Sequence, residues 1–308
     1  MINVMGVFDG MSCGQLALKK AGIPVNKYYA SEVDKYAIKV TMDNFPNTIQ
    51  LGDCQKISGY EYLDVDLLMA GSPCQGFSFA GKQLNFEDPR SKLFFEFVRL
   101  KEEINPKYWL LENVPMRKEY LDVITKYVGV EPVVINSGLV SAQNRKRYYW
   151  TNIPGISQPE DKGILIKDIL EAGSEVINYS SSGRGKGIVE KRISEAFKSY
   201  TLTAAQSSNR SITLVPVYHL PHGFNRGGVF DRDKMPSLRK DHHSNYYILN
   251  GEKFRKLSVI EHKRLQTVPD DYIMNVSDSQ AYKMLGNGWT VDVIAHILKG
   301  IKIESSEC

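Results

Sequence analysis

Two apolar runs of the sequence end in side chains that could carry out chemistry. Residues 65–70 are followed by Gly-Ser-Pro and then by the thiol of Cys74, and residues 108–111 are followed by the carboxyl group of Glu112. Proline fixes the backbone immediately before the thiol. If the two runs are strands of one open α/β sheet, their carboxyl ends face the same crevice. The sequence therefore predicts a nucleophile and a proton donor in one site.

A thiolate and a carboxyl group in one crevice are suited to covalent activation of an electron-poor ring. In cytosine, addition of a thiolate at carbon 6 makes carbon 5 an enamine carbon that can attack a methyl donor. We expect Glu112 to supply a proton or a strong hydrogen bond at ring nitrogen 3, which partial burial of the carboxyl group favours. Arg145 and Arg147 are candidate donors to the carbonyl oxygen of carbon 2, because alternate residues of a strand share a face.

The start of the sequence has the pattern of a nucleotide-binding turn between a strand and a helix. Residues 2–8 predict a strand, and the glycines of residues 9–14 permit a tight turn and close approach of a ligand. Glu32 follows the next predicted strand, where a carboxylate can accept hydrogen bonds from ribose hydroxyls. Asp53 follows the third, where a carboxylate can accept from an adenine amino group. These acids favour an adenosine ligand, and the missing P-loop pattern argues against a triphosphate.

Each of these residues also has a purely structural interpretation. A cysteine at a strand end is commonly a small buried apolar residue, and a carboxylate after a strand commonly caps a helix. Alternate arginines commonly line a solvated strand edge. Their order along the chain and their shared position at predicted strand ends favour the catalytic interpretation.

The predicted elements indicate an α/β fold with a doubly wound sheet and an inserted smaller domain. Short apolar runs alternate with helical patterns over the first 150 residues or so, which is typical of βαβ units. After Pro154 the helical periods fade, and they return after Gly251. Strands are predicted at 2–8, 25–31, 48–53, 65–71, 108–114, 131–137 and 146–153, and helices at 12–22, 34–45, 93–104, 118–128, 256–266 and 290–301.

Composition and charge restrict the functional class. The 308 residues carry a net charge of +4, but residues 181–251 hold eleven Lys/Arg against five Asp/Glu, which suggests a polyanion partner for that segment. The four cysteines show no CxxC spacing, which argues against a structural zinc site and a disulfide framework and suits a reducing cytoplasm. We expect no membrane segment, because no apolar run approaches about 20 residues, and no signal peptide.

In the order and type of these residues, the chain resembles the DNA cytosine-5 methyltransferases. The stretches FDGMSCG, SEVD and GDC are similar to the family's cofactor motifs, and GSPCQGFS, LLENV and QNRKRYYW to its nucleophile, glutamate and Gln-x-Arg-x-Arg motifs. DPRSKLFFEF, RKLSVIEHKRLQTVPDDY and MLGNGWTVDVIAHIL extend the resemblance. KLFFEF, SAQNRKRYYWTNIP and Trp289 resemble the eukaryotic de novo branch and its phage and bacterial relatives, whereas PCQGFS is of the bacterial type. We therefore expect a prokaryotic or phage enzyme acting alone.

The resemblance implies a class I S-adenosylmethionine-dependent methyltransferase fold with a Rossmann-like doubly wound sheet and no metal. Residues 1–152 and 253–308 would form the catalytic domain, and residues 153–252 the target recognition domain. Cys74 would be the nucleophile, with Glu112, Arg145 and Arg147 around a flipped base. The donor would lie against Phe8, Asp9, Gly10, Gly14, Glu32, Val33, Asp53, Cys54, Pro73, Leu93, Asn287 and Trp289. Double-stranded DNA would contact Gln75 and Ser78, with Arg184, Arg210, Arg226, Arg239 and Lys240 as candidates in the basic insert.

Further expectations follow from this resemblance, and three rival functions stay open. We expect a cytoplasmic enzyme, monomeric on DNA, with a cognate restriction enzyme as a candidate partner. One rival is a tRNA or RNA cytosine-5 methyltransferase, because the basic insert fits either polymer. A second rival is a catalytically silent DNA-binding regulator, which the presence of Cys74 and Glu112 disfavours. An NAD-type dehydrogenase would leave those residues unexplained.

Overall fold

The structure is a computed structural model of the chain. It describes the backbone of residues 1–72, 89–171, 216–219, 228–231, 234–236, 246–250 and 253–303, and the side chains of 1–72, 93–171, 234–235 and 257–303. Some of the predicted site residues lie outside the described residues: Pro73, Cys74, Gln75, Ser78, Arg184, Arg210, Arg226, Arg239 and Lys240.

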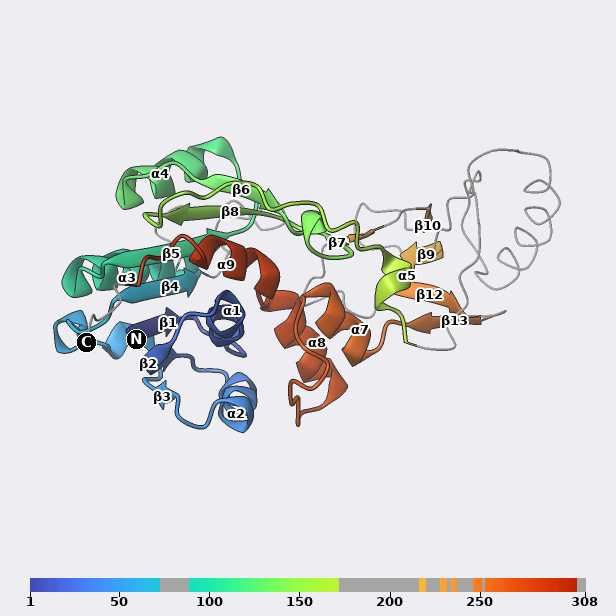
Figure 1. Cartoon of the computed structure of the whole chain (residues 1–308), viewed down its shortest axis with the longest axis horizontal. Coiled ribbons are helices and arrows are strands. Elements are labelled where there is room, and N and C mark those ends of the chain that lie inside the picture. The colour runs from blue at the N-terminus through green and yellow to red at the C-terminus, as the bar shows by residue number, and fades with distance from the viewer. Residues whose placement is uncertain are drawn as a thin grey trace.

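The main sheet confirms the predicted α/β class (Figure 1). Within the described residues its order is β3 (Ile49–Gln50), β2 (Val25–Ser31), β1 (Ile2–Val7), β4 (Leu67–Gly71), β5 (Tyr108–Asn113), β8 (Lys146–Thr151) and β6 (Val133–Asn136). β1 pairs in parallel with β2 and β4, and β4 pairs in parallel with β5. The strand order changes direction between β1 and β4, so the crevice expected at such a switch point lies beside their carboxyl ends.

One strand departs from the expected parallel sheet. β8 runs antiparallel to both β5 and β6. The connection from β6 to β8 contains the 3-10 turn Ser137–Leu139 and the short strand β7 (Gln143–Asn144). A parallel return needs a crossover of about a dozen residues or more. This shorter connection therefore brings the chain back antiparallel, between β5 and β6.

The predicted helices are confirmed, and local sequence explains their ends. Asp34 caps α2 by accepting a hydrogen bond from Tyr36 N, and Ser258 and Glu261 form a reciprocal capping box at α7. Gly129, in the left-handed conformation, ends α4. The helices are α1 (Cys13–Ala21), α2 (Lys35–Asn44), α3 (Pro89–Ile104), α4 (Lys118–Val128), α7 (Val259–Leu265) and α9 (Val291–Leu298).

A further helix, α8 (Asp278–Asn287), was not among the elements predicted from the sequence. Its last turn contains Gly286, and glycine inside a helix costs about 1 kcal/mol relative to alanine. Buried residues Ala281, Met284 and Leu285 fix α8 against the core. Tertiary packing therefore outweighs the weak local propensity.

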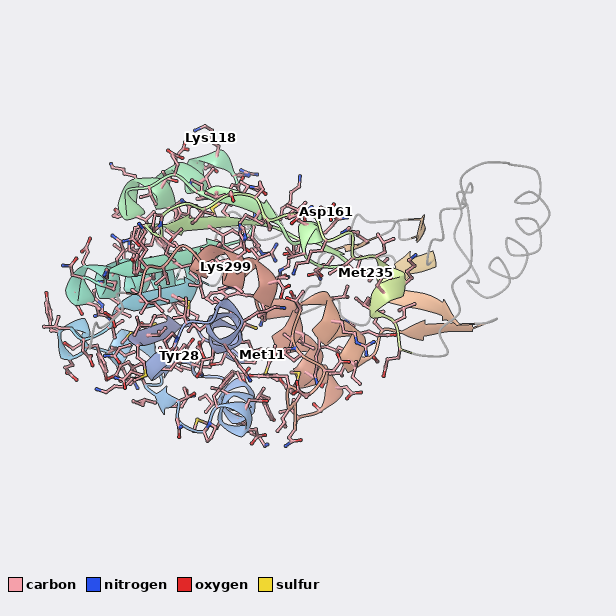
Figure 2. All side chains as sticks on the ribbon, in the orientation of Figure 1. Met11, Tyr28, Lys118, Asp161, Met235 and Lys299 are labelled. Carbon is pink, nitrogen blue, oxygen red and sulfur yellow. The ribbon has the colours of Figure 1, made fainter. Side chains whose placement is uncertain are left out.

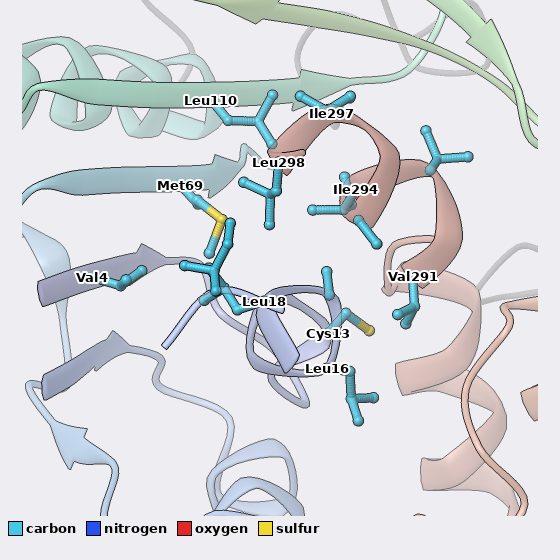
Figure 3. Packing of buried hydrophobic residues seen from close by; sticks show 14 of the residues in the cluster. Val4, Cys13, Leu16, Leu18, Met69, Leu110, Val291, Ile294, Ile297 and Leu298 are labelled. Carbon is cyan, nitrogen blue, oxygen red and sulfur yellow. The ribbon is translucent and has the colours of Figure 1, made fainter. Parts of the chain in front are cut away.

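Apolar residues alternate along the central strands, and each set packs under helices on its own face of the sheet. Leu67 and Met69 of β4 and Leu110 of β5 lie in one cluster with α1 and α9, which are far apart in the sequence (Figure 3). Leu68 and Leu111 lie in a second cluster, with α3 and α4. Continuous apolar runs whose successive residues pack on opposite faces are the pattern of a parallel sheet covered on both sides. The next alternate residue of β5 on the α1 and α9 face is Glu112.

A smaller sheet lies beyond α7 and α8 (Figure 1). Its order is β10 (Gly228–Asp231), β9 (Pro216–His219), β12 (Tyr246–Asn250) and β13 (Lys253–Lys256). The separate strand β11 (Met235–Pro236) pairs with β7. Met235 is fully buried and lies beside α5 (Ile166–Ile169), in a cluster that includes Ala142 and Leu265 (Figure 2). The strand β11 is thus attached to the chain just before β8 begins.

An acidic side chain on α9 joins three distant segments. Asp292 forms ion pairs with Lys20, at the end of α1, and with Lys162, after β8, and its side chain is 6% exposed. Its backbone N–H donates to Thr267 Oγ1 at 2.9 Å. Burial opposes ionisation, but the hydrogen bonds from Lys162 and Lys20 outweigh it and lower the pKa of Asp292.

We predict that Asp292→Asn lowers the free energy of unfolding by about 1–2 kcal/mol at pH 7, a modest value because both lysines are half exposed. A depressed folded-state pKa contributes stability above the unfolded pKa and loses it as pH falls through the folded value. The gap between the variant and the wild type should therefore narrow in acid, as measured by denaturant titration across pH. Asp122→Asn removes the exposed pair with Lys118 and should change little. Equal losses in both variants would contradict this account.

Candidate active site

The carboxyl ends of β1, β4 and β5 lie next to one another at the switch point of the sheet. Gly71, the last residue of β4, pairs with Glu112 of β5. Ser72 follows, and its buried Oγ accepts a hydrogen bond from Asn113 Nδ2 at 2.9 Å. This bond ties the end of β4 to the residue beside Glu112. The chain segment that leads to Cys74 therefore begins at the Glu112 end of β5.

Glu112 is a carboxylate buried among groups from two other segments. The residue is 7% exposed and faces the α1 and α9 side of the sheet. The indole Nε1 of Trp289, from the turn between α8 and α9, donates to Glu112 Oε2 at 3.2 Å. Arg147 Nε lies 2.9 Å from Glu112 Oε1 in an ion pair. A buried carboxylate requires such compensation, because its loss of hydration is costly.

Gly71 makes the approach of the indole possible. A Cβ atom at this position would lie 2.7 Å from Trp289 Nε1 and 3.3 Å from Glu112 Oε2. The first of these distances is shorter than a side chain tolerates. The absence of a side chain at Gly71 therefore allows Trp289 to lie across the end of β4 and reach β5.

The two candidate arginines lie close together but bind different groups. Arg147 faces Glu112, and among the residues described here its buried Nε has no hydrogen-bond acceptor with good geometry. Arg145 lies just before β8 and donates from Nη1 to Gly286 O at 3.2 Å and from Nη2 to Gly288 O at 3.0 Å. Burial, and then the like charge of Arg147, lowers the pKa of Arg145 to about 9.

The glycine-rich loop after β1 is organised by Glu32. Glu32 Oε2 accepts from Gly10 N at 2.8 Å, and Oε1 accepts from Val33 N at 2.7 Å and Asp34 N at 2.8 Å. Gly10 has φ of +59° with open space where a Cβ would be, so a ligand can approach this backbone. A carboxylate has about four lone-pair positions. One acceptor position on Glu32 is therefore left for a hydroxyl.

Asp9 lies partly buried inside the same loop, which the sequence alone does not reveal. It accepts hydrogen bonds from Ser12 Oγ and from Tyr28 OH, the latter at 2.6 Å. Burial is the main reason that the pKa of Asp9 is raised to about 6. Asp9 thus supports the loop from inside, while Phe8, with φ of 57°, and Gly10 shape its path.

Asp53 has the structural role of a cap, whatever else it binds. Its Oδ1 accepts from Gln55 N at 3.1 Å, at the start of the 3-10 turn Cys54–Lys56. Arg99 of α3 holds this turn from below by donating to Cys54 O at 3.1 Å and Ile57 O at 2.9 Å. Arg99 was not predicted as a site residue from the sequence, because it lies about three turns into α3 and belongs to no recognised motif.

The remaining predicted donor contacts differ in exposure. Val33 is 71% exposed, which is unusual for an apolar side chain. Leu93, on α3, is partly buried against the hydrophobic cluster that contains Leu68 and Leu111. A Cβ on Gly14 would lie 3.6 Å from Trp289 Cζ3, so the indole also covers the start of α1. Asn287 is exposed at the end of α8, and its predicted donor contact stays a prediction.

Gln143 was not among the site residues predicted from the sequence, although it is the first residue of the Gln-x-Arg-x-Arg stretch. Its side chain is fully buried, and neither its Nε2 nor its Oε1 has a hydrogen-bond partner within the described part of the chain. Buried polar groups in native proteins are nearly always paired. The unpaired side-chain amide of Gln143 therefore indicates that a further polar group fits beside it, two residues before Arg145.

The site is built from polar and aromatic side chains. Across the described ranges, no group of three or more His, Cys, Asp or Glu residues could hold a metal ion. In those same ranges no helix is long and apolar enough to cross a membrane.

Comparisons with known proteins agree with this geometry. The sequence is 28% identical over 98% of its length to the Type II methyltransferase M.NlaX of Neisseria lactamica, covering 96% of that protein. It is 28% identical to the Type II methyltransferase M.HhaI of Haemophilus parahaemolyticus, with 97% of this chain and 94% of that protein covered. The fold is similar to that of Spodoptera frugiperda DNMT2, with a TM-score of 0.65, 18% identity, and 97% of this chain and 99% of that chain covered.

A family model describes the chain from end to end. The match to the model of the C-5 cytosine-specific DNA methylases spans residues 2–303, which includes every element that contributes to the site. The chain belongs to the C-5 cytosine-specific DNA methylase family, and its enzyme class is that of the DNA cytosine-5 methyltransferases.

Proposed function

We propose that the chain transfers a methyl group from S-adenosylmethionine to carbon 5 of a cytosine flipped out of duplex DNA, through a covalent adduct with Cys74. The observation that carries the proposal is the buried carboxylate of Glu112, with Arg147 on one oxygen and Trp289 on the other. Ser72, two residues before Cys74, is hydrogen-bonded to the neighbour of Glu112. Family membership supports the same chemistry.

Each side chain has a defined task in this mechanism. Cys74 forms a bond from sulfur to carbon 6, while Glu112 supplies a proton at nitrogen 3, so that carbon 5 becomes nucleophilic. Arg147, whose Nε pairs with Glu112, would offer an Nη–H group to the developing charge on the carbonyl oxygen. After methyl transfer, water takes the proton from carbon 5, the thiolate is expelled, and nitrogen 3 returns its proton to Glu112, which restores the aromatic ring. Arg145 borders this group and holds the turn that carries Trp289.

The residues after β1, β2 and β3 fit an adenosine-containing donor. S-adenosylmethionine would supply the methyl group and leave as S-adenosylhomocysteine. Glu32 retains an acceptor position toward ribose, and exposed Val33 offers apolar surface to the adenine ring. Asp53 would accept from the adenine amino group through the oxygen that does not cap the turn. Phe8, the loop of residues 9–14, Cys54, Pro73, Leu93, Asn287 and Trp289 complete the proposed donor site.

The insert is the proposed DNA-recognition element. Residues 153–252 would bind phosphates through their excess of basic side chains and read base edges, with residues 1–152 and 253–308 forming the catalytic domain. Such contacts would offset the few kcal/mol, roughly, that flipping a base costs. Gln75 and Ser78 would contact DNA near the target base. We further propose that the enzyme acts as a monomer in the cytoplasm of a prokaryotic or phage-infected cell, with a restriction enzyme as its partner.

Measuring transfer of labelled methyl groups tests the function directly. The acceptors are duplex DNA, tRNA and no acceptor, and the methylated position is identified by mass spectrometry of the released nucleosides. We expect 5-methylcytosine in duplex DNA. Transfer to tRNA alone would replace DNA as the substrate, and no transfer to either would indicate a silent regulator.

We predict that Cys74→Ser abolishes turnover, because a hydroxyl is far less nucleophilic than a thiolate at neutral pH. Binding of S-adenosylhomocysteine, measured by calorimetry, should be unchanged. Cys308→Ser is the matched control, since Cys308 lies outside residues 2–303, the part of the chain that matches the family model. Wild-type methylation by Cys74→Ser would refute the covalent mechanism.

We predict that Glu32→Ala and Asp53→Ala each weaken donor binding by roughly 1–3 kcal/mol, the scale of a hydrogen bond to a charged group. Their effects on stability should differ. Glu32→Ala removes three bonds to backbone N–H groups and should lower the melting temperature, whereas Asp53→Ala removes a cap from a short turn. Calorimetry and thermal unfolding separate the two effects. Unchanged donor affinity in both variants would contradict the adenosine site.

We predict that the double substitution Arg239→Ala with Lys240→Ala weakens DNA binding and makes its dependence on salt shallower, because fewer counterions are released. Donor affinity should stay unchanged. A salt series of DNA-binding isotherms, beside calorimetry with S-adenosylhomocysteine, measures both quantities. Normal DNA binding combined with lost donor affinity would assign the insert to the donor site instead.

A further inference from the structure

The turn between α8 and α9 reaches the catalytic carboxylate as well as the donor loop. Trp289 covers the start of α1 near Gly14, and its Nε1 donates to Glu112 Oε2 at 3.2 Å. Placement over the loop after β1 accounts for the ring of Trp289 but not for the direction of its N–H group. An aromatic ring without a donor could fill the same space.

The position of the indole is fixed by an arginine that lies just before β8. Arg145 binds the carbonyl oxygens of Gly286 and Gly288, which lie three residues and one residue before Trp289. These carbonyls lie at the carboxyl end of α8, where backbone oxygens lack helical partners and attract cations. A planar guanidinium can bridge two acceptors in a fixed geometry, which an ammonium group cannot reproduce.

A second set of buried hydrogen bonds holds the same turn from the other side. Gln266 Nε2 donates to Leu285 O at 2.7 Å, and Thr290 Oγ1 donates to Gln266 Oε1 at 2.9 Å. Ser137 Oγ in turn donates to Thr290 Oγ1 at 2.9 Å. Side chains from the segment that follows β6 and from the end of α7 thus fix the residues on both sides of Trp289. Such a satisfied, buried network is rigid.

We propose that Trp289 is a positioning residue for Glu112, and that Arg145 acts through Trp289 by fixing the turn that carries it. The indole N–H holds one carboxylate oxygen, and the ion pair with Arg147 holds the other, so the carboxyl group keeps one orientation toward the base. This inference rests on the proposed methyl transfer. It adds that one side chain, that of Trp289, contacts both the start of α1 and the carboxyl group of Glu112.

The test compares Trp289→Phe with the wild type in steady-state and single-turnover methylation. Phenylalanine keeps an aromatic ring but removes the N–H donor. We expect kcat to fall about tenfold or more, the scale of one hydrogen bond to a charged group, while KM for S-adenosylmethionine changes by less than about twofold. Trp150→Phe is the matched control, because its fully buried indole donates to Thr125 Oγ1 at 3.0 Å, away from the site. That variant should lose stability but keep kcat.

Two results would overturn the proposal. One is a kcat of Trp289→Phe equal to that of the wild type, and the other is a loss confined to KM for the donor, which would assign Trp289 to the donor site alone. Failure of the proposed function would instead appear as absence of methyl transfer by the wild type, so the two failures are distinguishable.

A double-mutant cycle tests the role of Arg145. Arg145→Lys keeps the positive charge but cannot bridge both carbonyls, and we expect it to lower kcat. If Arg145 acts through Trp289, then Arg145→Lys combined with Trp289→Phe should lose no more activity than the more impaired single variant. Losses that multiply would show that Arg145 acts independently of the indole and would overturn this part of the proposal.

Discussion

The site depends on keeping a carboxylate buried at the carboxyl end of β5, an interior strand of the sheet. Removing Glu112 from water is costly unless other groups replace its hydration. The replacements come from two directions, Arg147 from the neighbouring antiparallel strand and Trp289 from the turn between α8 and α9. The same requirement explains Gly71, since any side chain there would occupy the path of the indole. Three segments that are far apart in the sequence therefore form the surroundings of this one carboxyl group.

The C-terminal helices return to the N-terminal sheet to meet this requirement. α9 packs against α1 over one face of the sheet (Figure 3). Asp292 of α9 pairs with Lys20, at the end of α1, and with Lys162, after β8. Arg145 and Gln266 then hold the turn before α9 through its carbonyl oxygens. Stability and catalysis are coupled here, because the contacts that close the fold also place Trp289.

The sequence predicted the parts of the fold that depend on local pattern. The short apolar runs identified β1, β2, β4 and β5, and Gly22 marked the end of the first helix. Glu112 was predicted as a site residue from its position at the end of a buried strand, and its catalytic role stays a proposal. Cys74 follows from the same argument, but it lies outside the described residues, and its role stays a proposal.

Features that arise from long-range contacts could not be predicted in this way. The reversal of β8 depends on the short connection from β6, and α8 forms by packing despite Gly286. Spacing placed both arginines on one strand face, whereas Arg145 precedes β8 and binds Gly286 and Gly288. No local signal shows which carbonyls a guanidinium will meet. The buried, unpaired amide of Gln143 is likewise visible only in three dimensions.

A crystal structure of the enzyme grown with S-adenosylmethionine and duplex DNA containing 5-fluorocytosine would test the central claim most directly. Once the methyl group is transferred, carbon 5 carries fluorine in place of hydrogen, so no proton can be lost, the thiolate is not expelled and the covalent adduct accumulates. We expect the sulfur of Cys74 bonded to carbon 6 and Glu112 within hydrogen-bond distance of nitrogen 3. Trp289 Nε1 should still donate to Glu112, and Arg147 should contact the carbonyl oxygen. A trapped base held away from Glu112, or an indole turned away from the carboxylate, would contradict the account.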